Sequence, residues 1–255
     1  MKEPTGPPRR FRRGVALLPV AFTIANLCMG FWALVRTLHG QFGKAAPLIL
    51  LAGVFDMLDG RIARLTGTTS EFGGELDSLA DVISFGIAPA LLAYCWGFPN
   101  VHKAGWVVAF LFVASGAMRL ARFNIQRHAV DGRYFVGMPI PAAAGQIATI
   151  VWFEPEMPYE LLASLLMMAL VLALSLLMVS TFRYPSFKGI DLRTRRSYVI
   201  VLPIALAIAV LVLHPQSVLL ALSTLYSLWA PGVYLIGLAF RRRTPPPRPA
   251  AAAAL

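Results

Sequence analysis

Long apolar segments separated by short polar joints dominate the chain. We count eight of them, each near the roughly 20 residues that cross the hydrocarbon core of a bilayer. They cover residues 15–37, 44–65, 73–96, 104–126, 137–153, 159–181, 197–213 and 216–240. Glycine or proline lies at the joints, as at Gly40, Gly67 and Pro215, where helices are expected to end. The pattern predicts an all-α fold: a polytopic membrane helix bundle of about eight transmembrane helices.

Composition and charge place this bundle in a lipid bilayer. Of the 255 residues, 58% are hydrophobic, and the mean hydropathy of +0.68 excludes an ordinary soluble domain. The net charge of +11 comes from basic residues concentrated at alternate ends of the apolar segments. Of the 23 lysines and arginines, only Arg36, Lys44 and Lys103 fall at the other ends. Because basic residues stay on the cytoplasmic side, we expect both termini in the cytoplasm, an inner-membrane location and no nucleic-acid partner.

The polar flanks of the apolar region divide the chain into three parts. Residues 1–14 are rich in arginine and proline and are expected to form a basic cytoplasmic arm. Residues 15–240 form the membrane domain. Residues 241–255 lack a core-forming pattern, so we expect a disordered cytoplasmic tail. Cys28 and Cys95 lie inside apolar runs, and no disulfide framework follows from them.

An acid-rich stretch, residues 56–81, interrupts the apolar pattern. Its first half places five residues on one helix face, because their spacing follows the helical repeat: Asp56, Asp59, Gly60, Ala63 and Arg64. Its second half places three residues, four apart, on one face of the next helix: Gly73, Asp77 and Asp81. A turn through residues 66–70 lets the two faces meet. Four carboxylates are therefore expected to converge on one point.

Converging carboxylates in an apolar chain repel one another and need a positive partner. Oxygen ligands without histidine or cysteine nearby favour a hard cation, Mg²⁺ or Mn²⁺, as one or two ions. Arg64 on the same face suits phosphate oxygens, and the small Gly60, Ala63 and Gly73 allow a ligand to approach the backbone. The stretch predicts a site for a metal-bound phosphate or pyrophosphate.

The same residues carry a resemblance to a known family. The pattern Asp-x2-Asp-Gly-x2-Ala-Arg-x8-Gly-x3-Asp-x3-Asp, read from Asp56 to Asp81, resembles the signature of the CDP-alcohol phosphatidyltransferase family at every fixed position. The resemblance runs from about Pro19 to Lys188. Four further segments resemble the phosphatidylserine synthase branch of that family: residues 84–89, 119–124, 137–145 and 178–188.

This resemblance implies an activity and assigns residues to it. The activity is metal-dependent transfer of the phosphatidyl group of CDP-diacylglycerol to L-serine, giving phosphatidylserine and CMP. Four residues are implied as metal ligands, of which Asp81 is also the general base: Asp56, Asp59, Asp77 and Asp81. Seven are implied as CDP-diacylglycerol contacts: Thr23, Asn26, Gly60, Ala63, Arg64, Ser70 and Gly73. Three are expected to bind serine: Arg119, Arg122 and Asn124. Family members resemble homodimers, and the active site is expected to face the cytosol.

Several alternatives stay open at this level. Val20 stands where the family pattern has an asparagine, and Asn26 also suits a plain helix–helix hydrogen bond. Arg119 and Arg122 equally suit anchoring at the membrane surface. A sibling enzyme would use glycerol phosphate, inositol phosphate or choline as acceptor. An ion or solute transporter would use the acids as an ion site, but the chain lacks a convincing internal repeat.

Overall fold

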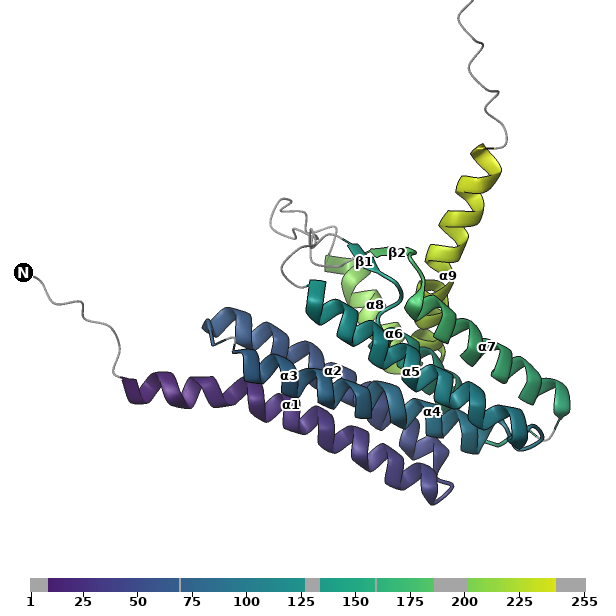
Figure 1. Ribbon diagram of the computed structural model, residues 1–255, viewed down its shortest axis with the longest axis horizontal. Helices are drawn as coiled ribbons and strands as arrows, with labels where there is room; N and C mark the ends of the chain where they lie inside the picture. Colours follow the sequence, from purple (N-terminus) through teal and green to yellow (C-terminus); the bar gives the residue numbers. More distant parts are fainter. Residues whose placement is uncertain (1–8, 69, 127–133, 159, 186–200, 242–255) are drawn as a thin grey trace, which may run out of the picture.

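The computed structural model describes residues 9–68, 70–126, 134–158, 160–185 and 201–241, which fold into a helical bundle with one small sheet (Figure 1). The helices are α1 (Arg9–Leu38), α2 (Phe42–Thr66), α3 (Glu71–Asp81), α4 (Ala88–Leu92), α5 (His102–Gln126), α6 (Ile140–Phe153), α7 (Leu161–Val179), α8 (Val201–Leu213) and α9 (Pro215–Arg241). The π-helical segment η1 (Val82–Ile87) joins α3 to α4, and a second one, η2 (Ala93–Gly97), continues α4, so residues 71–97 form one continuous helical rod. The strands are β1 (Tyr134–Val136) and β2 (Arg183–Pro185).

Each of the eight predicted apolar segments is helical, with ends within a few residues of those expected. Within the described residues, four helices are long and apolar enough to cross a membrane. Helices α8 and α9 meet at a bend of 113°, and they would form a fifth span if they were counted as one broken helix. Helix α6 has only 14 residues, and α2 carries the charged half of the acid-rich stretch. The protein is a multi-pass membrane protein, whereas the number of eight spans stays a prediction.

The turn between α2 and α3 is built by local capping. Helix α2 ends at Gly67, whose φ of 62° is left-handed and favours glycine. The amides of Gly67 and Thr68 both donate to the carbonyl of Ala63. Ser70 then begins α3 by accepting a 3.0 Å hydrogen bond from the amide of Gly73 on its hydroxyl. This tight connection brings the acid-bearing faces of α2 and α3 together.

Helix α1 packs along both α2 and the α3–η1 rod. A Cβ at Gly30 would collide with Ser84 of η1, so glycine is what allows this close approach. The Ser84 hydroxyl donates to the carbonyl of Asn26 across the same contact at 3.1 Å. These contacts fix the position of α1 along its axis relative to the acid-bearing helices.

The buried core lies between α2, the α4–η2 rod and helices α5 to α7. Its largest fully buried side chains include Ile49, Phe85, Leu92, Phe112 and Ile147. Helix α6 is central, because it packs against both α2 and α9 and buries most of its length. Its repeated alanines are small enough for helices to pack closely on two sides.

The two-stranded sheet departs from the predicted all-helical pattern. Strands β1 and β2 pair antiparallel with Phe135 opposite Tyr184. The amide of Gly137 donates to the carbonyl of Phe182, which extends the link from the start of α6 to the end of α7. Three-residue strands that pair across a long stretch of sequence leave no periodic signal, which is why the pattern did not predict them. The basic positions expected in 127–133 and 186–196 lie outside the described residues.

Candidate active site

The predicted acids do converge. One carboxylate oxygen from each of Asp56, Asp59 and Asp77 lies within 4.8 Å of the other two. The side chain of Asp81 is within hydrogen-bonding reach of Asp56. Asp59 and Asp81 are buried, at 5% and 8% exposure, so water screens little of their mutual repulsion. Two neighbouring helices thus supply all four acids of one cluster, and η1 begins directly after the last of them.

Thr23 brings a third helix to this cluster. Its hydroxyl oxygen lies 3.0 Å from Oδ2 of Asp59 and 3.1 Å from the carbonyl oxygen of Pro19. The hydroxyl has one proton, and the carboxylate is the stronger acceptor of the two. Thr23 therefore orients Asp59 directly. The predicted contact of Thr23 with CDP-diacylglycerol stays a prediction beside this hydrogen bond.

Asn26 lies one turn further along the same face of α1. It has 0% exposure, and neither its Oδ1 nor its Nδ2 has a hydrogen-bond partner among the described residues. The interhelical hydrogen bond that was one interpretation of Asn26 is therefore not formed by its side chain within this part of the chain. A buried amide without partners is costly.

The donor set of the cluster fits a hard divalent cation. All the ligand atoms are carboxylate oxygens, which suit Mg²⁺ or Mn²⁺. Oδ1 of Asp81 is buried and has no hydrogen-bond partner among the described residues. Four acids this close are compensated only weakly by the exposed side chain of Arg64, which interacts electrostatically with Asp59. The residues present thus match the predicted metal site, although they do not distinguish the two ions.

The residues expected to receive the donor lie around the α2–α3 turn. The guanidinium of Arg64 passes over Gly60, with Nη1 3.6 Å from the point where a Cβ would be. The carbonyl of Ala63 caps α2, and Ser70 and Gly73 form the N-cap of α3. Their polar groups therefore have structural partners already. Arg64 and Ser70 are exposed, whereas Gly60, Ala63 and Gly73 are half-buried.

Helix α5 contacts α3 next to one of the acids. Nδ2 of Asn124 donates a 2.9 Å hydrogen bond to the hydroxyl of Ser78, the residue after Asp77. Arg119 is partly buried and interacts electrostatically with Asp81 and with Tyr226 of α9. Arg122, by contrast, is exposed. Of the three predicted serine-binding residues, Arg119 thus interacts with one of the acids and Asn124 contacts the residue after another, while the serine-binding role of all three stays a prediction.

Sequence reasoning assigned no role to Tyr226 of α9, which interacts electrostatically with Arg119. The last two apolar segments lay outside the resemblance, and nothing in their periodicity singles out one tyrosine. The one available signal was a group of small polar residues in an otherwise apolar helix: Ser223, Thr224 and Ser227.

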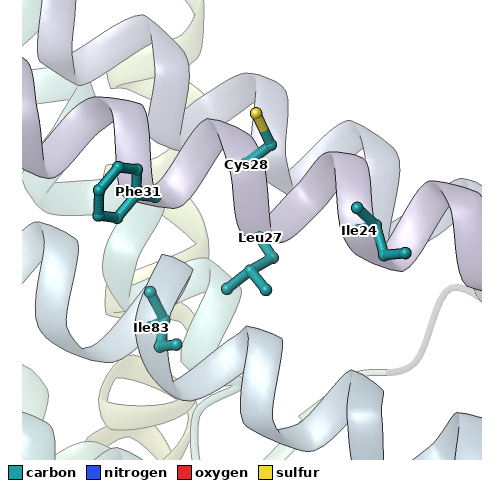
Figure 2. Close-up of a pocket in the computed structure, with 5 residues that line it drawn as sticks. All are labelled: Ile24, Leu27, Cys28, Phe31 and Ile83. Atoms are coloured by element: carbon teal, nitrogen blue, oxygen red, sulfur yellow. The ribbon is translucent and has the colours of Figure 1, made fainter.

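An apolar pocket lies between α1 and η1. Figure 2 shows its lining, and its walls are Ile24, Leu27, Cys28 and Phe31 of α1 and Ile83 of η1. Ile24 follows Thr23 in sequence, and Ile83 comes two positions after Asp81. The lining of the pocket is entirely apolar, and none of the four acids belongs to it.

The acidic cluster lies at one end of the bundle. The first half of α1, the α2–α3 turn, the end of α5 and the two strands gather toward the same side in Figure 1, whereas the connections after α1, η2 and α6 lie at the other. The contacts from Thr23 to Asp59 and from Asn124 to Ser78 agree with this placement. Arg61, Arg64, Arg119 and Arg122 share this end with the acids.

Comparisons of the chain with known proteins agree on one family. The model of the CDP-alcohol phosphatidyltransferase family matches residues 16–179. A CDP-diacylglycerol–serine O-phosphatidyltransferase of Helicobacter pylori is 39% identical over 213 residues, covering 83% of this chain and 90% of the relative. An archaetidylserine synthase of Methanothermobacter thermautotrophicus is 37% identical over 179 residues, covering 69% of this chain and 73% of the relative. With its signature acids gathered on two adjoining helices and most of its length matched, this chain belongs to the CDP-alcohol phosphatidyltransferase family.

Proposed function

We infer that the protein is a CDP-diacylglycerol–serine O-phosphatidyltransferase. The observation that carries this inference is the convergence of Asp56, Asp59 and Asp77, with Asp81 against them, in a chain 39% identical to a serine phosphatidyltransferase over most of its length. In the reaction, the serine hydroxyl oxygen bonds to the phosphorus that carries the diacylglycerol. The bond from that phosphorus to the bridging oxygen breaks, and CMP leaves.

The acid cluster is the proposed metal site. Asp56, Asp59, Asp77 and Asp81 would hold one or two Mg²⁺ or Mn²⁺ ions, supported by the all-oxygen donor set and the unpartnered Oδ1 of Asp81. When bound, such a cation neutralises pyrophosphate charge and the negative charge that develops on the departing nucleotide. Thr23 holds Asp59 in one orientation for this role.

The chain's own residues have separate tasks toward the two substrates. Asp81 accepts the proton of the attacking hydroxyl as general base. Arg64 binds diphosphate oxygens at the exposed side, where Gly60 leaves room. Asn26 offers its buried amide to the donor, and the pocket around Ile24 and Ile83 offers its acyl region an apolar surface. Exclusion of water around the buried Asp59 and Asp81 would protect the donor from hydrolysis.

The acceptor side is assigned to α5. Arg119 and Asn124 line the acids from that helix, and a guanidinium suits the carboxylate of serine. We propose that this end of the bundle faces the cytosol at the inner cell membrane, because the arginines near the acids follow the distribution expected for cytoplasmic ends. A homodimer is also proposed, on family resemblance alone.

One assay tests the function. The purified chain in mixed micelles is given CDP-diacylglycerol and radiolabelled serine, with and without a chelator, and both labelled lipid and CMP are measured. Equal amounts of labelled phosphatidylserine and CMP, lost with chelator and restored by Mg²⁺ or Mn²⁺, are expected. Parallel reactions with glycerol phosphate, inositol phosphate and choline test the sibling activities. CMP release with one of these acceptors and none with serine would refute the assignment of the acceptor.

A further inference from the structure

One face of α1 is buried where the helix packs against both α2 and the α3–η1 segment. The buried residues recur at intervals of three and four, which keeps them on one stripe of the helix: Thr23, Asn26, Gly30, Ala33 and Thr37. These residues are small, and small residues allow the backbones of two helices to come close together. The position of α1 is therefore set by backbone contacts that leave little room for adjustment.

Gly30 lies directly against Ser84 of η1. A Cβ at position 30 would be 2.7 Å from both Cα and Cβ of Ser84 and would also collide with the Ser84 hydroxyl oxygen. Because the Cα of Ser84 is a backbone atom, no rotation of a side chain would relieve this collision. One turn before Gly30, the Ser84 hydroxyl donates to the carbonyl of Asn26 at 3.1 Å. Ser84 thus fixes α1 at two successive turns.

Thr23 lies on the same stripe as Gly30, about 10 Å earlier along the helix axis. The two positions are separated by almost two complete turns and therefore point in nearly the same direction. The Thr23 hydroxyl oxygen is 3.0 Å from Oδ2 of Asp59, which is already at the long end of the usual range for a hydroxyl donor. A short helical segment moves as a unit, so a displacement of α1 by a few tenths of an ångström at Gly30 would break the hydrogen bond of Thr23.

We propose that Gly30 and Ser84 are positioning residues of the proposed metal site. Their contact sets how closely α1 lies against the acid-bearing helices, and this position keeps the Thr23 hydroxyl within hydrogen-bonding distance of Asp59. The two residues act through Thr23 on the orientation of one metal ligand, as the outer partners of metal ligands commonly do. The proposal rests on the proposed function, in which Asp59 binds the cation.

A contact that only stabilised the fold would behave differently. Alanine favours a helix more than glycine does, so a loss in Gly30→Ala arises from the collision with Ser84 and not from the helix itself. If the contact only held the fold together, the variant would lose thermal stability and bind metal as before. If the contact positions Thr23, the affinity for metal falls as well, and it falls no further once Thr23 is valine.

The test measures Mn²⁺ binding to the purified full-length chain in detergent, without substrates. The EPR signal of unbound Mn²⁺ gives the Kd, so the measurement does not depend on turnover. We expect Gly30→Ala to raise the Kd about tenfold, as Thr23→Val should, because both lose the same orienting hydrogen bond. The double variant Gly30→Ala/Thr23→Val should raise the Kd little more than either single change.

Gly105→Ala is the matched control. A Cβ at Gly105 would be 2.8 Å from Cδ2 and 2.9 Å from Cβ of Phe98, so this change also forces a close contact apart. Gly105 is near the start of α5, at the end of the bundle away from the acids (Figure 1). The variant should lower the melting temperature and leave the Kd for Mn²⁺ within twofold of wild type.

The outcomes distinguish this proposal from the proposed function. Wild-type enzyme that makes no phosphatidylserine refutes the function. An active wild-type enzyme whose Kd for Mn²⁺ is unchanged in Gly30→Ala, or is raised equally in Gly105→Ala, refutes the positioning role alone, and so do fully additive effects of Gly30→Ala and Thr23→Val. If Gly30→Ala gives no folded protein, Ser84→Ala takes its place, because it removes the hydrogen bond to the Asn26 carbonyl without adding volume. Ser84→Ala should raise the Kd about threefold, and an unchanged Kd would overturn the proposal.

Discussion

Replacement of Thr23 by valine tests the arrangement of the acid cluster most directly. Valine has nearly the shape of threonine but lacks the hydroxyl that lies 3.0 Å from Oδ2 of Asp59. Both residues have 5% exposure, so water has little access to replace the missing donor. The change removes one hydrogen bond to a proposed metal ligand and leaves the packing of α1 almost intact.

The size of the effect follows from the geometry. A hydrogen bond to a charged group contributes about 1.5–3 kcal/mol. The lower half of that range applies here, because the Thr23 proton is shared with the Pro19 carbonyl at 3.1 Å. About 1.4 kcal/mol corresponds to a tenfold change in a binding constant. Loss of such an orienting partner typically lowers metal affinity or activity 10- to 100-fold. We therefore expect about tenfold weaker metal activation.

The assay is a titration of CMP release with Mg²⁺ or Mn²⁺ at saturating CDP-diacylglycerol and serine. Thr23→Val should raise the half-activating metal concentration about tenfold, and Thr23→Ser, which keeps the hydroxyl, should restore it to within about threefold of wild type.

Thr37→Val is the matched control. Thr37 is also a buried threonine of α1, at 2% exposure, but its hydroxyl donates only to the carbonyl of Ala33 at 2.8 Å. It lies at the opposite end of the helix from the acids. The reasoning would be refuted by a Thr23→Val enzyme whose metal curve overlays that of wild type, or by an equal shift in Thr37→Val.

Three further predictions concern the base, the acceptor pocket and the contact between α6 and α9. Asp81→Asn should remain folded by circular dichroism yet lose CMP release by 100-fold or more, about the contribution of a general base; retained turnover would contradict that role. In steady-state kinetics, Arg119→Ala should raise the KM for serine about tenfold, and replacement of the exposed Arg122 by alanine should raise it less. A larger rise in Arg122→Ala than in Arg119→Ala would favour Arg122 as the partner of the serine carboxylate. Gln146→Leu removes two hydrogen bonds between α6 and α9, each worth about 0.6 kcal/mol, and should lower the melting temperature by about 3 °C. An unchanged melting temperature would show that these hydrogen bonds contribute nothing measurable to the stability of the fold.

The sequence predicted what depends on local spacing. The helical repeat put Asp56 and Asp59 on one face of α2 and Asp77 and Asp81 on one face of α3. Gly67 and Ser70 marked a tight turn between them, and that turn alone brings the two faces together. Two helices joined by a short turn can adopt few orientations relative to each other. The acid cluster and the eight helical segments could therefore be predicted from the sequence pattern.

The tertiary structure decided which distant residues complete the site. Thr23 meets Asp59 across 36 positions of sequence, Asn124 meets Ser78 across 46, and Ser227 meets Gln146 across 81. No periodicity relates such pairs, because the packing of several helices at once sets their contacts. The sequence thus determined a membrane helix bundle with a cluster of acids whose oxygen donors suit a divalent cation. Packing alone decided that Arg119 is partly buried and interacts electrostatically with Asp81 while Arg122 is exposed, and that α9 packs against α6.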